Sequence, residues 1–162
     1  MFESAIAQAA ANFNVPVSWI QAVIETESSW NPQAYRAEPR INDASYGLMQ
    51  LLYRTARGLG YTGQPDGLYD PETNINLGTR LLGELRRKHG DDFRRVYSAY
   101  NSGNPDLWET STQVAANVAR AVTNLTRWVS TGVSEFARAP ESGPLVGLLI
   151  LVLLWAWTGK RR

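Results

Sequence analysis

One glutamate, Glu27, is the strongest candidate for acid–base chemistry in this sequence. Three apolar residues before it follow the spacing of one buried helical face: Val17, Ile20 and Ile24. Glu27 comes next on that face, whereas Glu25 is rotated by about 200° and is expected to face solvent. A carboxyl among apolar neighbours stays protonated near neutral pH, which makes Glu27 a competent general acid.

The helix that carries Glu27 has a start signal at Asn14 and Pro16. Proline loses no hydrogen bond at the first helical position, and asparagine can cap nearby. The alternative for Glu27 is structural: it caps the helix end or forms a salt bridge, because ordinary helices often end in charged residues. This helix alone leaves both interpretations open.

Composition argues against several classes of partner and cofactor. The net charge is +1 and no Lys/Arg run is longer than three residues, so no nucleic-acid partner is expected. The chain has no cysteine and a single histidine, which gives little support to a metal site or a Ser-His-Asp triad. We therefore expect no metal and no cofactor. His89 lies beside basic residues at a predicted helix end, where positive charge suits the helix dipole and Gly90 closes the helix.

The hydrophobic periodicity predicts a mainly α fold. Two helix starts carry acidic caps: Asp70 before Pro71, and the Asp91–Asp92 pair. A short hairpin is expected near 35–45. The predicted helices cover residues 2–13, 16–29, 45–58, 72–89 and 92–102.

The chain divides into a globular zone and two further zones. Residues 1–105 have a globular composition, and residues 106–139 have the apolar spacing of one long amphipathic helix. We expect this helix to be a stalk that packs on a neighbouring helix or forms a homo- or hetero-oligomer. The alternative is a helix lying flat on a membrane, with Trp128 beside Arg127. Few Lys and Arg residues lie on its polar face, which favours packing.

After a linker at residues 140–144, residues 145–158 are expected to form a transmembrane helix in a lipid bilayer. The stretch from 142 to 159 is uncharged, and tryptophans precede a basic tail at 159–162. A buried core helix is the alternative, because the strictly apolar run is short. The basic tail favours an interior carboxyl end, but long flanking domains can override that rule, so the orientation stays open.

Four segments of the globular zone form a recognisable pattern: Glu27–Pro32, Ser45–Leu51, Tyr69–Ile75 and Ala99–Gly103. Together they resemble the soluble lytic transglycosylase family, whose fold is similar to goose-type lysozyme. They occur in family order over about residues 5–105. Ser102 stands where the family usually has alanine, and the insert at 34–40 resembles variants from bacteriophage enzymes. The resemblance therefore implies a lysozyme-like α-helical domain.

This resemblance implies that Glu27 is the single catalytic acid and base. The reaction would cleave the β-1,4 bond between N-acetylmuramic acid and N-acetylglucosamine in peptidoglycan glycan strands. Glu27 would protonate the leaving oxygen and then take the proton of the muramoyl C6 hydroxyl, which closes onto C1 as a 1,6-anhydro sugar. A second catalytic carboxylate is not required, unlike in most glycosidases.

The resemblance also implies residues that bind substrate or orient the acid. Tyr100 would lie near the carboxyl, although a core tyrosine with a hydrogen-bond partner is the alternative. Gly47 and Gln50 would line the saccharide groove. Met49 would contact the groove or fill the core. Asn101 would bind backbone or sugar.

Ser28 and Asp43 each have a structural alternative to a role in the site. Ser28 could serve either the helix end or the site. Asp43 is by default a loop aspartate, and in the cleft it could position water and favour hydrolysis. A membrane-anchored lytic transglycosylase, acting on the periplasmic cell wall from a virion or bacterial inner membrane, is the leading hypothesis. A hydrolytic muramidase and a non-catalytic, glycan-binding or structural membrane component of a virion are the alternatives.

Overall fold

The computed structural model describes residues 2–138 of the 162-residue chain. They divide into one compact unit that ends at Ser130 and a second that begins at Thr131. The predicted linker, membrane anchor and basic tail, at residues 140–162, lie outside the described residues. Within residues 2–138, no helix combines the length and the apolar character that crossing a bilayer requires.

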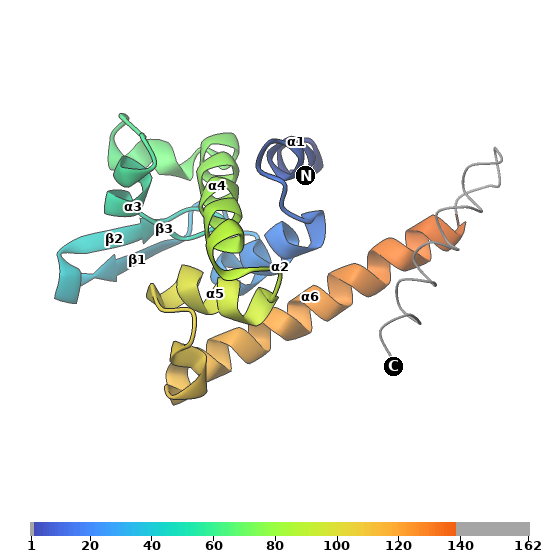
Figure 1. The fold of residues 1–162 in the computed structure, drawn as a ribbon. Coiled ribbons are helices and arrows are strands. Elements are labelled where there is room, and N and C mark those ends of the chain that lie inside the picture. The colour runs from blue at the N-terminus through green and yellow to red at the C-terminus, as the bar shows by residue number, and fades with distance from the viewer. Residues whose placement is uncertain (1, 139–162) are drawn as a thin grey trace. The chain divides into compact units, whose positions relative to one another are not determined.

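The first unit is mainly helical, as the sequence predicts (Figure 1). Short 3₁₀ helices occupy Pro39–Ile41, Pro65–Tyr69 and Leu107–Glu109. The α-helices are α1 (Glu3–Phe13), α2 (Val17–Ser28), α3 (Tyr53–Gly58), α4 (Pro71–His89), α5 (Phe93–Ser102) and α6 (Thr112–Arg138).

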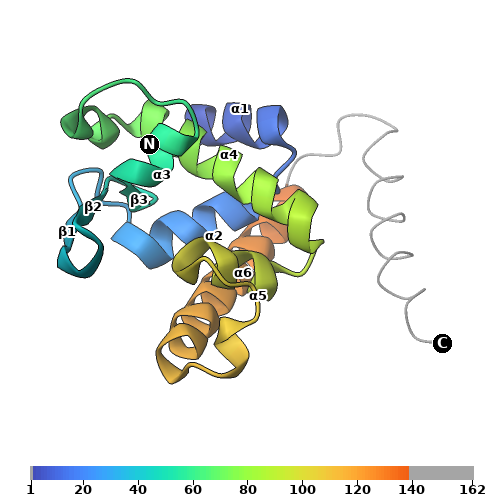
Figure 2. The same ribbon diagram turned by 60° about the vertical axis from the view of Figure 1, so that its left-hand side comes forward.

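Helix α2 lies at the centre of this unit. In Figure 2, α1 and α4 lie on one side of α2, and α5 and the first part of α6 lie on the other. Helix α4 packs against both α1 and α5. Ile20, Val23 and Ile24 of α2 are fully buried, because neighbouring helices cover almost every face of α2. The helix that carries Glu27 is therefore held from several directions.

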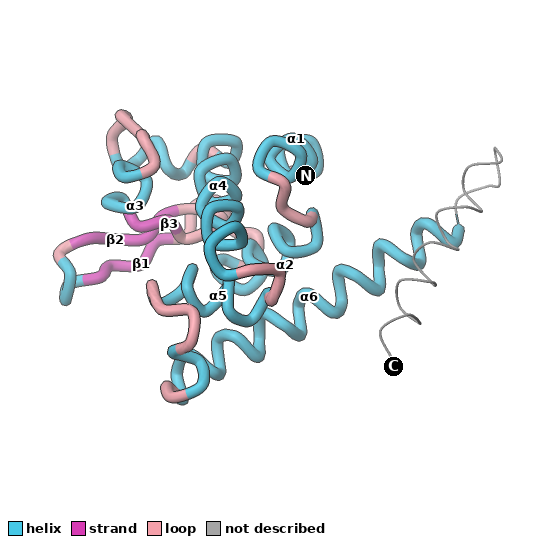
Figure 3. The backbone as a smooth tube through the Cα atoms, viewed as in Figure 1, coloured by secondary structure: helices cyan, strands magenta, loops and turns pink. Residues whose placement is uncertain are grey.

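A small antiparallel sheet lies beside the helices (magenta in Figure 3). Strand β1 (Tyr35–Glu38) pairs with β2 (Asp43–Tyr46), which confirms the predicted hairpin. Strand β2 also pairs with β3 (Leu51–Leu52). The helix predicted over 45–58 is wrong in its first half, because α3 begins only at Tyr53. Gly47 and Gln50 have φ angles of 73° and 47°, which a right-handed helix does not allow.

The helix ends follow the predicted chemistry in most places. The carboxylates of Asp70 and Asp92 accept hydrogen bonds from the backbone N–H groups of Thr73 and Arg94, at 2.9 and 3.0 Å. Gly90 closes α4 as predicted. The capping role predicted for Asn14 is wrong. Asn14 ends α1 in the left-handed region, at φ 53°, and α2 starts after Pro16 with no side-chain cap.

Helix α6 continues the core beyond residue 105, where the sequence places the end of the globular zone. Val114, Val118 and Ala121 are buried in the same hydrophobic core as α2 and α5. The Asn124 amide donates a 3.0 Å hydrogen bond to the Thr26 hydroxyl on α2. The first part of the predicted stalk therefore packs on helices of its own chain.

Candidate active site

Glu27 lies in the last turn of α2, where the helix stops because Ser29 adopts a left-handed conformation with φ 51°. It follows the face of Ile20 and Ile24, both fully buried, as the apolar spacing predicts. Val17 departs from that prediction, because 43% of it is exposed at the start of the helix. The carboxyl of Glu27 also lies at the negative end of the helix dipole, which disfavours its ionised form.

Glu27 lines a groove of about 490 Å³. The hairpin, the carboxyl-terminal half of α4 and the end of α5 form its walls. The structure brings four of the predicted site residues together in this groove: Glu27, Gln50, Tyr100 and Asn101. A second cleft, between α1, α4 and residues 59–62, contains none of the predicted site residues.

The hydroxyl of Tyr97 donates a hydrogen bond of 2.7 Å to Oε1 of Glu27. Tyr97 is fully buried on α5 and stacks between Phe93 and Tyr100. The sequence analysis did not identify this residue. The available signal was its position three residues before Tyr100, on the same face of the helix.

Burial raises the pKa of the Glu27 carboxyl above its ordinary value. The hydrogen bond from Tyr97 opposes this rise, as do the positive charges of Arg36 and Arg120 and a hydrogen bond with Asn101. Desolvation is the largest of these effects, so the neutral acid is favoured. Burial also raises the pKa of Tyr97 and Tyr100, which keeps both hydroxyls protonated as donors.

Tyr100 reaches the site by a different contact from the one expected. Its hydroxyl donates a 2.7 Å hydrogen bond to the backbone carbonyl of Met49 rather than to Glu27. The Met49 side chain is fully buried, and its sulfur lies 4.0 Å from the hydroxyl of Thr79. Met49 therefore fills the core, which was the alternative to groove contact, and its backbone anchors Tyr100.

Gly47 also has a structural explanation. A Cβ atom at this position would lie 2.5 Å from Nδ2 of Asn74 and 2.6 Å from the carbonyl oxygen of Leu68. Asn74 is fully buried and holds this loop with bonds of 2.8 Å each to Met49 N–H and to the carbonyls of Tyr46 and Leu68. Glycine thus lets the backbone of this loop lie close to Asn74 and Leu68. Asn74 holds the loop that shapes the site, and the sequence analysis did not identify it.

Gln50 lines the groove and also binds backbone. Its amide nitrogen donates to the carbonyls of Ala34 and Gly47, at 3.0 and 3.1 Å. These bonds fix the insert before β1 against the loop after β2. The side-chain oxygen of Gln50 remains an acceptor for a ligand hydroxyl.

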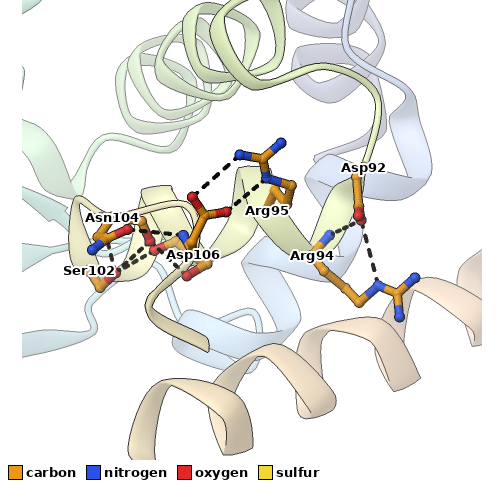
Figure 4. A network of polar contacts seen from close by, with 7 residues as sticks. Asp92, Arg94, Arg95, Ser102, Asn104 and Asp106 are labelled. Atoms are coloured by element: carbon orange, nitrogen blue, oxygen red, sulfur yellow. Dashed lines mark hydrogen bonds and ion pairs between the residues drawn. The ribbon is translucent and has the colours of Figure 1, made fainter. Parts of the chain in front are cut away.

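The end of α5, which carries Asn101, is braced by a polar network (Figure 4). Arg95 donates to the carboxylate of Asp106 at 2.9 Å, and Oδ1 of Asn104 accepts from the Asp106 N–H at 3.0 Å. The Ser102 hydroxyl bonds to the carbonyls of Ser98 and Asn104. These contacts fix the turn after α5 and thus the edge of the groove.

Ser28 and Asp43 take the structural role that the sequence analysis left open. The Ser28 hydroxyl donates to the carbonyl of Ile24 at 3.0 Å, within its own helix. The Asp43 carboxylate accepts hydrogen bonds from the backbone N–H groups of Ala44 and Arg54, at 2.8 and 3.1 Å, and pairs with the Arg54 guanidinium. Asp43 therefore stabilises the hairpin.

Glu25 faces α6 rather than solvent, which corrects the prediction. Its carboxylate accepts a 2.8 Å hydrogen bond from the indole N–H of Trp128 and pairs with Arg127. Glu25 does lie on a different face of α2 from Glu27, but α6 covers that face. His89 ends α4 as expected, and it also lines the groove beside Lys88.

Glu38 is the other carboxylate that lines the groove among the described residues. It pairs with Arg36 at 2.6 Å, and both side chains belong to β1. Over residues 2–138, no cluster of three His, Asp or Glu side chains could hold a metal ion. Glu27, which accepts a hydrogen bond from Tyr97, is a groove residue that could transfer a proton.

Comparison with known proteins identifies the family of the chain. The sequence profile of the transglycosylase SLT domain matches residues 4–122, more than half of the chain. The chain belongs to the transglycosylase SLT domain family. The match extends past residue 105 to the buried part of α6, in agreement with the core positions of Val114 and Val118.

Curated relatives share the same region. The soluble lytic murein transglycosylase of Escherichia coli K12 is 36% identical over 98 residues, covering 55% of this chain and 14% of that protein. The transglycosylase of Enterobacteria phage PRD1 is 32% identical over 108 residues, covering 67% of this chain and 37% of that protein. The chain thus spans much less than half the length of these relatives.

Solved structures agree in fold. The lytic transglycosylase Slt of Pseudomonas aeruginosa superposes with a TM-score of 0.69 at 20% identity, covering 80% of this chain and 24% of that one. The 70 kDa soluble lytic transglycosylase of Escherichia coli gives a TM-score of 0.55 at 27% identity, covering 76% and 19%. These similarities confirm the mainly helical, lysozyme-like fold of the SLT domain.

Proposed function

We propose that this protein is a peptidoglycan lytic transglycosylase that cleaves the β-1,4 bond between N-acetylmuramic acid and N-acetylglucosamine. The observation that carries the proposal is the Glu27 carboxyl in the groove, which accepts a hydrogen bond from Tyr97 and whose pKa is raised by burial. Membership of the SLT domain family and the names of the curated relatives support the same substrate.

In the first step, Glu27 donates its proton to the glycosidic oxygen as positive charge develops at C1 of the muramoyl residue. The carboxylate left behind is costly in a desolvated site. The Tyr97 hydroxyl, 2.7 Å from Oε1, stabilises this anion with a charge-assisted hydrogen bond.

In the second step, the same carboxylate removes the proton from the C6 hydroxyl of the muramoyl residue. The freed oxygen closes onto C1 and gives a 1,6-anhydro end. Because the attacking oxygen belongs to the substrate, its effective concentration is high and no bound water is needed. Glu27 regains its proton and is ready for another cycle.

Sugar hydroxyls and acetamido groups need planar donor–acceptor partners. Gln50 and Asn101 line the groove and supply amide groups of this kind. Arg36 and Lys88 add positive charge to the groove, which suits anionic groups of the substrate. We assign these residues to substrate binding.

The proposal is tested by digesting purified peptidoglycan and analysing the products by mass spectrometry. We expect 1,6-anhydro ends with the wild-type protein, none with Glu27→Gln, and normal yield with Glu72→Gln, an exposed control on α4. Reducing muramic acid ends would indicate a hydrolytic muramidase instead. Undiminished lysis by Glu27→Gln would contradict an enzymatic role for Glu27, and absence of products with every variant would favour the non-catalytic, glycan-binding component.

We also propose that residues 145–158 anchor the protein in a virion membrane or bacterial inner membrane. The uncharged stretch from 142 to 159 and the basic tail after it support this location. One curated relative is the transglycosylase of a phage, and we propose a role in phage entry for this chain. A chain shortened to residues 1–138 should lose membrane association and keep its activity, and unchanged membrane association would contradict the anchor.

A further inference from the structure

Helix α6 contributes two side chains to a hydrogen-bonded relay that leads to the catalytic acid. The Arg120 guanidinium donates a 3.2 Å hydrogen bond to Oδ1 of Asn117. Nδ2 of Asn117 donates a 3.2 Å hydrogen bond to Oδ1 of Asn101 on α5. Asn101 lines the groove together with Glu27, and its side chain favours the Glu27 carboxylate. The relay thus runs from the surface of α6 to the groove that holds the reacting carboxyl.

The direction of this relay is set by arginine, because a guanidinium can only donate. Asn117 must therefore present its oxygen to Arg120 and its NH₂ group to Asn101. Asn101 then presents its own oxygen to Asn117, so its NH₂ group is left for Glu27. An asparagine without such a partner could turn its amide over at little cost.

We propose that Asn117 and Arg120 are positioning residues, which hold the Asn101 amide with its NH₂ group toward Glu27 and thereby stabilise the carboxylate formed during the reaction. This inference rests on the proposed function. It assigns part of the catalytic machinery to α6, which lies outside the four sequence segments that resemble the family.

The charged and titratable groups around Glu27 come from four elements. Tyr97 and Tyr100 belong to α5, and Arg120 belongs to α6. Arg36 and Glu38 of β1 line the groove, as do Lys88 and His89 of α4. An uncharged substitution at Asn117 leaves all of these groups in place, so it isolates the orientation of the Asn101 amide from the other influences on Glu27.

Asn117→Asp is the most informative variant, because aspartate can only accept hydrogen bonds. It keeps the bond to Arg120 but forces Asn101 to turn its NH₂ group toward residue 117 and its oxygen toward Glu27. An acceptor facing Glu27 favours the protonated acid. We expect the alkaline limb of the kcat profile to move to higher pH. We also expect kcat to fall about tenfold with little change in KM, as for a lost hydrogen bond to a charged group.

Three further variants separate orientation from charge. Asn117→Leu removes the donor without adding charge. It should move the alkaline limb of the kcat profile to higher pH, but less far than Asn117→Asp does. Gln113→Glu adds a charge at an exposed position one turn earlier on α6 and should leave the profile unchanged. Arg120→Met should shift the profile in the same direction as Asn117→Leu but further, because it also removes a positive charge that favours the Glu27 carboxylate. Arg120→Lys, which keeps a donor and its charge, should restore the wild-type profile.

The outcomes distinguish this inference from the proposed function. A wild-type profile in Asn117→Asp, or a shift in Asn117→Asp without one in Asn117→Leu, overturns the positioning role. A carbon-13 NMR titration of the Glu27 carboxyl in the same variants measures the change in its pKa independently of catalysis. If the wild-type protein yields no anhydro product, the proposed function fails, and the titration still decides whether Asn117 acts on Glu27.

Discussion

The hydroxyl of Tyr97 lies 2.7 Å from Oε1 of Glu27 and donates a hydrogen bond to it, although the two residues are 70 positions apart in the sequence. The contact joins α5 to the last turn of α2. A neutral carboxyl accepts this bond at its carbonyl oxygen, and a carboxylate accepts it more strongly. Tyr97 therefore favours release of the proton and limits the rise in pKa that burial imposes on Glu27.

Tyr97→Phe removes this hydrogen bond and keeps the ring that stacks between Phe93 and Tyr100. Because a hydrogen bond to a charged group contributes about 1.5–3 kcal/mol, kcat should fall at least about tenfold. The alkaline limb of the pH profile should move to higher pH. Steady-state assays on peptidoglycan over a range of pH measure both effects.

Tyr53→Phe is the matched control for Tyr97→Phe. The Tyr53 hydroxyl donates a 3.1 Å bond to the carbonyl of Gly63, away from the groove. Its removal should leave the pH profile unchanged. Equal losses of activity in both variants would mean that Tyr97 acts through general stability rather than through Glu27.

Asn74→Asp tests the loop that supports the groove. Aspartate can still accept from the Met49 N–H, but it cannot donate to the carbonyls of Tyr46 and Leu68, and its charge is buried without a partner. The free energy of unfolding should fall by about 3 kcal/mol or more. Urea unfolding monitored by tryptophan fluorescence measures it. Asn76→Asp, exposed on the same helix, should be nearly neutral, and similar values for the two variants would contradict the role assigned to Asn74.

Glu27 should make stability depend on pH in a defined direction. Its pKa is raised above the ordinary 4.5 in the folded protein, so between the two pKa values the folded state binds more protons than the unfolded state. The stability that Glu27 contributes is complete below the unfolded pKa and is lost as pH rises through the folded pKa. Glu27→Gln does not titrate and should therefore be the more stable protein at alkaline pH.

Urea unfolding at about pH 4 and about pH 8 tests this linkage. The two proteins should have similar stability at the lower pH, and Glu27→Gln should be more stable at the higher pH. Glu72→Gln, which removes an exposed carboxyl on α4, should follow the wild type at both. If Glu27→Gln were more stable than the wild type only at acidic pH, the pH dependence of stability would have the opposite sign. That result would refute the raised pKa of Glu27.

Glu38→Gln tests whether a second carboxylate takes part. Glu38 lines the groove but pairs with Arg36 at 2.6 Å, and the proposed mechanism gives it no proton to transfer. The variant should still produce 1,6-anhydro ends, with kcat within about threefold of the wild type because an exposed ion pair contributes little. Mass spectrometry of the digest provides the measurement. Loss of all products would assign Glu38 a catalytic role and favour a mechanism with two carboxylates.

Local signals in the sequence predict much of this fold and part of its site. The 3.6-residue spacing before Glu27 places the carboxyl on a buried face, and Asp70 and Asp92 begin their helices as capping chemistry predicts. Gln50 and Asn101 reach the groove as the family resemblance implies. These features depend on neighbours within a few residues or on a known motif.

Contacts between distant segments account for most of what the sequence analysis missed. Tyr97 and Tyr100 share a face of α5, and local spacing cannot decide which hydroxyl meets Glu27. Glu25 turned inward because α6 covers it, through the indole of Trp128 at 2.8 Å. The first half of the helix predicted over 45–58 is a strand and a turn instead. Gln50 in that turn has a positive φ of 47°, and the sequence gives little sign that a non-glycine residue will adopt such a conformation.

The most direct test of the central claim is the titration of Glu27 itself. Carbon-13 NMR of the wild-type protein would follow the side-chain carboxyl carbon over a range of pH, with Glu27→Gln used to assign the signal. The account predicts a midpoint above the ordinary value of 4.5. A midpoint at or below that value would show that the carboxyl is ionised when substrate arrives, and Glu27 could not then act as the general acid.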